Sequence, residues 1–354
     1  MFSFAIMQFF FAPLMGELSD RFGRKPILLI ALFGLGLDYI FHAFAPTTFW
    51  LFVGRVLAGI CGASFTVANA YIADISTPDD KAKNFGMVGA AFGLGFIVGP
   101  VIGGLAAEYS IQLPFFIAAA LSLANMIYGL LVIPESLPIE KRRSFNFRKA
   151  NPVASILGMR RYPMIFGMIA SFLFIHLASH AVQSTWAYFT MLKFSWTTSD
   201  VGYSLAFVGI VVAIVQAGMV GRIKKRLGER NMIITGFVLY GTGMILFAFA
   251  PTGWSLYLFS IPYCLGGIAG PTIQGLLSNQ VPDNEQGELQ GMLTSVMSLT
   301  AIIGPPMMTS IFSTFTESPD LLYFPGAPFI LGSILMITSL ILMVKALNRI
   351  RAAA

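Results

Sequence analysis

The chain has 354 residues, of which 56% are hydrophobic and 11% are charged, and its net charge is +6. Because a soluble domain has roughly 25% charged residues, this composition excludes an ordinary soluble enzyme, a disordered chain and a nucleic-acid-binding protein. Two cysteines inside apolar runs exclude a disulfide framework and a cysteine-rich metal site. We therefore expect no bound metal ion. The composition is that of a polytopic membrane protein.

The apolar runs between the charges predict the membrane-spanning helices, since a helix needs roughly 20 apolar residues to cross the bilayer core. The runs are too long for strands and lack the alternation of a barrel. In chain order, the eleven runs cover residues 1–15, 26–45, 47–73, 84–107, 112–133, 163–189, 200–221, 231–250, 254–279, 288–313 and 327–347. The first is shorter than its neighbours.

The basic residues predict the topology. Of the 22 Lys and Arg, 20 fall in alternate connections on one side, among them Arg148, Lys149, Arg160 and Arg161. Cytoplasmic connections carry such an excess, so this side and the C-terminus are predicted to be cytoplasmic. The same excess explains the pI near 9.3 without any nucleic acid.

An internal repeat organises the chain. Gly16–Gly23 resembles Gly221–Gly228, and Gly99-Pro100 matches Gly304-Pro305, both at an offset of 205 residues. Parallel repeats of six helices are one of the known plans of transporters. We therefore predict an N-terminal bundle at 1–133, a basic cytoplasmic linker at 134–162 and a C-terminal bundle at 163–354.

The repeat also predicts a missing helix. The span 163–189, shifted back by 205 residues, falls before residue 1. We expect that about 45 residues of a longer parent, including the first helix, are absent. The alternative is a protein of eleven helices with an external N-terminus.

The loop between the first two spans contains a candidate gate. Its sequence is Gly16-Glu-Leu-Ser-Asp20-Arg21-Phe-Gly23-Arg24-Lys25-Pro26. The glycines allow a tight reversal, Asp20 can complement the dipole at the N-terminus of a neighbouring helix, and Arg24 can pair with Asp74. This run resembles the loop signature of the major facilitator superfamily. The resemblance implies that the partner of Asp20 is the helix beginning near Gln286.

A second motif lies in the span 84–107. Gly95, Gly99 and Gly103 would stack on one helix face and let another helix approach closely. Together with Pro100 and Gly104, they resemble the fifth-helix motif of the superfamily's antiporters. The repeat copy keeps only the Gly-Pro pair.

Over almost its whole length the chain resembles the tetracycline/proton antiporter branch, for example in Leu37-Asp38-Tyr39 and Ala70–Asp74. The resemblance implies that Asp38 is needed for transport and that Gln8 faces the substrate cavity. The chain departs from the branch where the best-known pumps have a histidine and an aspartate, since it has Val212 and Tyr240 there.

Further polar groups lie within spans. An intramembrane Arg55 requires a partner or a watery cavity, and Asp38 is the natural candidate. Asn69 and Gln274 are repeat mates and suit a central cavity. Gln183 and Gln216 either face the same cavity or form hydrogen bonds between helices.

Two of the three histidines, His176 and His180, are four residues apart on one helix face. Imidazoles titrate near neutral pH, so this pair is a candidate for proton coupling. Hydrogen bonding within the bundle is the alternative role. The third, His42, is expected at the outer membrane interface.

Together these features predict an all-α polytopic membrane protein of the major facilitator fold, with two six-helix bundles and about 11 helices present. The predicted function is proton-coupled efflux of an amphipathic small molecule or drug by alternating access in the bacterial inner membrane. The expected partners are the substrate, protons and lipid. We expect a monomer, no nucleic acid, and no cofactor besides the proton gradient. Proton-linked or facilitative uptake of a small metabolite, or an inactive fragment, remain alternatives. Motifs of intramembrane enzymes are absent, so no catalytic residue is predicted.

Overall fold

The computed structural model describes residues 2–147, 150–158, 163–317 and 322–353. These ranges contain α-helices, short 3₁₀ turns, one π-helical segment and no strand. The all-α prediction is therefore confirmed for the described part of the chain. Arg148, Lys149, Arg160 and Arg161 of the predicted linker lie outside the described residues.

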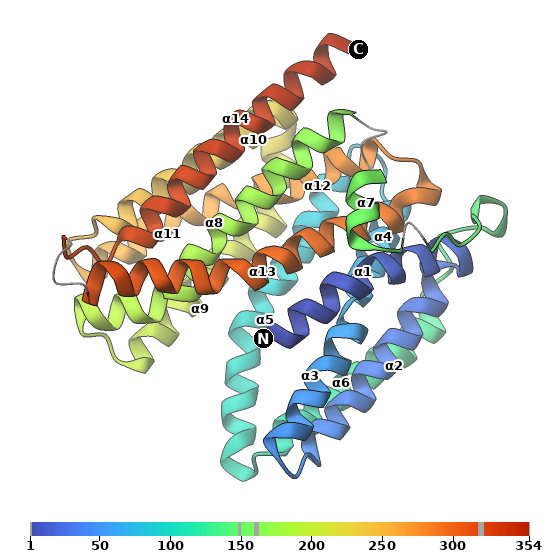
Figure 1. Cartoon of the computed structure of the whole chain (residues 1–354), viewed down its shortest axis with the longest axis horizontal. Helices are drawn as coiled ribbons and strands as arrows, with labels where there is room; N and C mark the ends of the chain where they lie inside the picture. Colours follow the sequence, from blue (N-terminus) through green and yellow to red (C-terminus); the bar gives the residue numbers. More distant parts are fainter. Residues whose placement is uncertain (1, 148–149, 159–162, 318–321, 354) are drawn as a thin grey trace. The chain divides into compact units, whose positions relative to one another are not determined.

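Contacts divide the chain into two compact units. Unit 1 comprises Met1–Thr77, Val98–Arg161 and Ser278–Leu299. Within it, α2 packs against α6 and α3, and α1 packs against α3 (Figure 1). Its helices are α1 (Phe2–Phe22), α2 (Arg24–Ala43), α3 (Thr48–Gly62), α4 (Ser64–Ile75), the C-terminal part of α5 (Lys81–Tyr109), α6 (Leu113–Val132), η1 (Ile139–Lys141), α7 (Pro152–Gly158), η4 (Asp283–Glu285) and the first part of α13 (Gln286–Glu317).

Unit 2 comprises Pro78–Ile97, Tyr162–Leu277 and Thr300–Ala354. In this unit α14 packs along α8 and α10, and Ser171 and Ser339 form a 2.8 Å hydrogen bond between α8 and α14. Its helices are the first part of α5, α8 (Pro163–Phe194), α9 (Thr198–Ile214), the π-helix η3 (Val215–Met219), α10 (Val220–Ala248), α11 (Gly253–Gly266), α12 (Ala269–Asn279), the rest of α13 and α14 (Ala327–Ala353). The predicted bundles, 1–133 and 163–354 with the linker 134–162 between them, were defined by the sequence repeat, whereas the two units are defined by spatial contacts. The predicted division of the chain therefore stays a prediction.

Ten helical stretches among the described residues are long and apolar enough to cross a membrane. The sequence predicts eleven spans. The difference lies in Thr198–Ala248, which is continuous over 51 residues. At 1.5 Å per residue such a stretch is about 76 Å long, more than twice the thickness of the bilayer core. The backbone leaves the helical conformation at Gly228, where the two predicted spans separate.

The repeat is visible in the backbone. Gly23 and its repeat mate Gly228 have φ angles of 100° and 72°, a region that residues with a Cβ rarely adopt. The helix pair α3 and α4 is interrupted at Ala63, and the pair α11 and α12 is interrupted at the equivalent point, after Gly266. The same unit of sequence therefore folds in the same way twice.

Close helix packing on α5 occurs earlier than the sequence predicts. A Cβ added to Gly95, Gly99 or Gly103 would meet no atom within 4 Å, whereas one added to Gly89 would meet the side chain of Gln216 at 1.4 Å. One added to Gly93 would meet the carbonyl oxygen of Gly209 at 3.0 Å. The first part of α5 thus packs against η3 and α9 in unit 2. The functional role of the later glycines, with Pro100 and Gly104, stays a prediction.

The two glycines with positive φ provide a matched pair of variants. Gly228→Ala meets no neighbour, so it should cost only the strain of placing a Cβ residue at its backbone angles, φ 72° and ψ 165°, which is about 1–3 kcal/mol. Gly23→Ala adds a contact of 2.3 Å with the Glu135 carboxylate, which is held by the N-terminus of α2. In thermal unfolding of the purified protein, we expect Gly23→Ala to lower Tm by clearly more than Gly228→Ala. Equal losses would show that Glu135 moves aside freely.

Candidate functional site

The reversal between α1 and α2 brings the predicted gate motif against the N-terminus of α13. Asp20 is fully buried and accepts hydrogen bonds from the backbone N–H groups of Gly287 (2.9 Å) and Glu288 (3.1 Å). These N–H groups have no partner within their own helix, so a carboxylate satisfies them and complements the helix dipole. A Cβ on Gly16 would lie 2.1 Å from the carbonyl oxygen of Gly287. Only a glycine lets α1 approach this closely.

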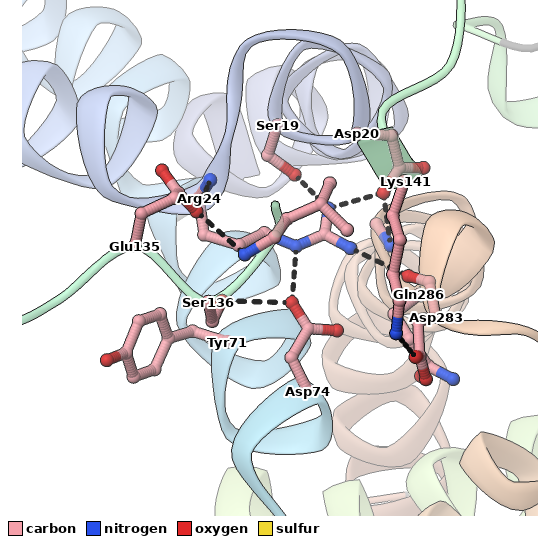
Figure 2. A network of polar contacts seen from close by, with 12 residues as sticks. Ser19, Asp20, Arg24, Tyr71, Asp74, Glu135, Ser136, Lys141, Asp283 and Gln286 are labelled. Atoms are coloured by element: carbon pink, nitrogen blue, oxygen red, sulfur yellow. Dashed lines mark hydrogen bonds and ion pairs between the residues drawn. The ribbon is translucent and has the colours of Figure 1, made fainter. Parts of the chain in front are cut away.

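Arg24 is the centre of the network in Figure 2. Its side chain is fully buried; Nε donates to Asp74 Oδ2 at 2.9 Å, and one terminal nitrogen donates to Ser19 Oγ at 2.8 Å and pairs with Asp20. The other terminal nitrogen donates to the backbone carbonyl of Asp283 at 3.2 Å. A planar guanidinium can serve acceptors in several directions at once, which a lysine ammonium does not reproduce. Arg24 therefore connects α1, α4 and η4.

The residues after α6 complete this network, and sequence analysis did not find them. Glu135 accepts from the backbone N–H groups of Arg24 (2.8 Å) and Lys25 (3.2 Å), so it caps the N-terminus of α2. Ser136 donates to Asp74 Oδ2 at 3.0 Å. Of the remaining motif residues, Lys25 reaches the carbonyl of Leu130 at 2.9 Å, and Arg21 is exposed.

Arg143 joins the same network from the linker. One terminal nitrogen lies 2.5 Å from Glu17 Oε1 and 2.8 Å from Asp20 Oδ2, and the other lies 2.8 Å from Glu288 Oε2. The pKa of the Arg143 guanidinium is raised, because the charges of these carboxylates outweigh burial, which alone would lower it. Glu17 and Glu288 are each 1% exposed. The linker thus ties the end of α1 to the start of α13.

Lys141 forms the exposed margin of the network. Its ammonium lies 2.8 Å from Asp283 Oδ2, and both side chains are more than half exposed. The hydrogen bond and the charge of Asp283 raise the pKa of Lys141. This pair is therefore complete around neutral pH and is lost as the pH rises through the raised pKa of Lys141.

A second polar cluster lies in α2 and α3. Asp38 is 3% exposed and His42 is 4% exposed, so the His42 side chain is buried in unit 1, and its place near the outer membrane interface stays a prediction. The His42 Nδ1 atom lies 2.9 Å from the Asp38 backbone oxygen and 3.2 Å from its Oδ2, and Arg55 Nε donates to His42 Nε2 at 3.0 Å. Arg55 therefore reaches Asp38 through His42. His42 could have been found from its i,i+4 spacing to Asp38.

The predicted cavity residues have local partners of different kinds. In unit 1, Gln8 donates to the carbonyl of Gly62 at 3.3 Å and accepts from Ser298 at 3.1 Å, and Asn69 is buried. In unit 2, Gln183 is exposed, and its amide donates to the Ser179 hydroxyl at 3.2 Å. Gln216 lies on the π-helix η3 and its side chain packs against Gly89. Gln274 is half-buried. Asn69 and Gln274 belong to different units.

His176 and His180 lie on α8 in unit 2. His176 Nδ1 bonds the carbonyl of Phe172 at 2.8 Å, and the ring of His180 packs against Gly304. Across the described residues, no three His, Cys, Asp or Glu side chains are grouped closely enough to hold a metal ion.

Helices of membrane-spanning length, a parallel repeat and a buried carboxylate inside a span together define a secondary membrane transporter. The sequence profile of the Major Facilitator Superfamily matches residues 1–305 and 218–353. The chain belongs to this superfamily, as its motifs predict, and it is a transporter rather than an enzyme.

Relatives agree with the predicted branch. The chain is 39% identical to the class C tetracycline resistance protein of Escherichia coli, over 95% of this chain and 84% of that protein. It is 36% identical to the class B protein of Escherichia coli, over 88% of this chain and 77% of the relative. Multidrug resistance protein 2 of Bacillus subtilis is 29% identical, over 93% and 82%.

Solved structures share the fold. The human organic anion transporter MFSD10 (TETRAN) has a TM-score of 0.86 at 23% identity, over 96% of this chain and 82% of that chain. The transporter FucP in its outward conformation has a TM-score of 0.76 at 15% identity, over 97% and 89%. The predicted fold class is confirmed.

Charge exchange tests the pair at the centre of the gate network. Arg24→Asp leaves buried carboxylates without their cation, which typically costs about 3–5 kcal/mol. Adding Asp74→Arg restores opposite charges but not the bonds to Ser19 and Asp283. We therefore expect the double variant to recover part of the Tm lost by Arg24→Asp, with the exposed Arg349→Asp as the control. A double variant no better than the single changes would refute the pairing.

The linker contacts differ in strength according to burial. Arg143→Ala removes the cation from three buried carboxylates and should cost about 3–5 kcal/mol, whereas Lys141→Ala removes an exposed pair and should change Tm little. Arg143→Lys keeps the charge but loses the fork of donors, so its Tm should lie between wild type and Arg143→Ala. Similar losses for Lys141→Ala and Arg143→Ala would contradict this ranking.

Proposed function

We propose that the chain exports an amphipathic small molecule or drug across the bacterial inner membrane in exchange for protons. Asp38 is the observation that carries this proposal. A carboxylate that is 3% exposed inside a span is costly, and such groups mark ion pathways and proton relays. Inward movement of one proton releases about 2.3 kcal/mol per 100 mV, which can drive the export.

The relatives support the cargo class. Three are named for resistance to tetracycline or to several drugs, and tetracycline is therefore the first probe. In this proposal the residues that contact the substrate are Gln8, Arg55, Asn69, Gln183, Gln216 and Gln274. The C-terminus is cytoplasmic, as the basic residues predict.

The gate network supports alternating access. Asp20 and Arg24 tie the reversal between α1 and α2 to η4 and the start of α13, which belong to opposite copies of the repeat. For the cytoplasmic side to open, these buried pairs must separate. We propose that Gly16, Asp20, Arg21, Gly23, Arg24, Lys25 and Asp74 hold this side shut in one state, and that the linker residue Arg143 reinforces them.

Proton exchange in everted membrane vesicles tests the function. With a pH gradient established, tetracycline or another amphipathic drug should release protons from vesicles containing the wild-type protein. Asp38→Asn should abolish this release while the protein is still inserted, because a neutral amide cannot carry the proton. Arg349→Asp is the control. Normal release by Asp38→Asn would refute the role of Asp38, and drug uptake without proton movement would favour a facilitator.

The histidines on α8 are a second proposed coupling site. If they carry the proton, the variant with His176→Gln and His180→Gln should change the pH profile of exchange. If the profile is unchanged, coupling rests on Asp38 and the groups around it. The same vesicles and drugs serve this comparison.

A further inference from the structure

His42 occupies the space between the two charged residues of its cluster. It lies one helical turn after Asp38 on α2 and faces Arg55 on α3, and each of these groups is within 3.2 Å of one ring nitrogen. No contact of 4 Å or less joins Arg55 directly to Asp38 among the ion pairs of the described residues. The imidazole is thus the route between them.

The contacts determine the tautomer of the ring. An arginine nitrogen only donates, so His42 Nε2 must accept, and it therefore carries no proton. The single proton of the neutral ring is then on Nδ1, where it faces the backbone oxygen of Asp38 at 2.9 Å and Oδ2 at 3.2 Å. If Nε2 carried a proton, two N–H donors would face each other. His42 can therefore either accept the hydrogen bond from Arg55 at Nε2 or hold a proton there, but not both.

The ring is held on its other sides by apolar groups. The Phe115 ring of α6 stacks on it at 5.7 Å with an interplanar angle of 12°, and a Cβ on Gly54 of α3 would lie 2.4 Å from it. The helix α6 carries no ionisable group apart from Tyr128, which is exposed. The remaining ionisable groups on the neighbouring helices α1, α3 and α4 are Cys61 and the groups of the gate region Glu17, Asp20, Arg21, Tyr71 and Asp74.

We propose that His42 relays the proton to Asp38 and that its tautomer controls whether Arg55 is bound. This inference rests on the proposed proton-coupled export. Arg55 first leaves Nε2, and an incoming proton bonds to that nitrogen. The imidazolium then gives its Nδ1 proton to Asp38 Oδ2. The products are a neutral Asp38 carboxylic acid and a neutral ring with its proton on Nε2.

This sequence of steps makes Arg55 a sensor of the Asp38 proton. While Asp38 holds the proton, the ring has its N–H toward Arg55, and the two donors cannot bond. When Asp38 returns the proton to Nδ1 and the ring releases the Nε2 proton, Arg55 can bind again. Each proton cycle therefore breaks and restores the contact between α2 and α3.

Nitrogen NMR of the purified protein tests the tautomer without any substrate. The chain has three histidines, so the protein labelled with ¹⁵N-histidine and carrying His176→Gln and His180→Gln reports His42 alone. We expect the neutral ring to have its proton on Nδ1. In Arg55→Met, both tautomers of the neutral ring should appear, because no donor then faces Nε2. A wild-type ring protonated on Nε2, or a tautomer unaffected by Arg55→Met, would overturn the proposal.

Proton exchange with tetracycline in vesicles tests the relay. His42→Gln can still accept from Arg55 and donate to Asp38, but it cannot take up and pass on a proton. We expect it to lower proton-coupled exchange by about tenfold or more, while drug-for-drug exchange, which moves no net proton, is retained. If His42→Gln keeps the wild-type rate and pH profile, the ring only positions its neighbours and the relay is refuted. If wild type itself releases no protons, the proposed function fails.

Discussion

The buried carboxylate of Asp20 is the group on which the organisation of unit 1 depends. A charge removed from water is tolerated only with close partners, and Asp20 has them on three sides: Arg24, Arg143 and the first N–H groups of α13. Each partner comes from a different part of the chain. The end of α1, the start of α2, the linker and the start of α13 are therefore held together by the solvation requirement of one side chain.

The two copies of the repeat keep their backbone but not their charges. Gly23 and Gly228 share a positive φ, whereas Asp20 and Arg24 are replaced at the offset of 205 by Lys225 and Glu229. In unit 2, Lys224 donates to the backbone carbonyl of Asp79 at 2.7 Å and pairs with Glu229 at 2.9 Å. In unit 1, Arg24 donates to the carbonyl of Asp283, which follows α12 as Asp79 follows α4. In both units a basic side chain thus bonds the backbone of the segment that follows α4 or α12. The charged side chains of this contact are fully buried in unit 1 and partly exposed in unit 2.

Features marked by apolar runs or by recognisable motifs could be predicted, and contacts that no motif marks could not. Span positions follow from runs of apolar residues. Arg24 lies in the Gly16–Pro26 motif and Asp74 ends the motif Ala70–Asp74, and their side chains are 2.9 Å apart in the structure. Glu135 and Arg143 reach the gate across more than 100 residues of chain, and nothing in their own surroundings indicates a partner. Close packing on α5 was predicted at Gly95, Gly99 and Gly103, but it occurs at Gly89 and Gly93. Small residues permit another helix to approach closely, but they do not specify which helix approaches or at which residue.

The helix α2 connects the two polar clusters. It begins at Arg24 in the gate network and carries Asp38 and His42 further along. Fourteen residues of helix separate Arg24 from Asp38, which is about 21 Å at 1.5 Å per residue, too far for a direct Coulomb interaction to matter. A continuous helix nevertheless moves as a rigid element. In the proposed mechanism, α2 loses one polar contact with α3 when Arg55 separates from His42, while its N-terminus keeps the cap from Glu135 and the bonds of Arg24. We propose that protonation of Asp38 and opening of the gate are coupled through the movement of this helix rather than through a chain of charges.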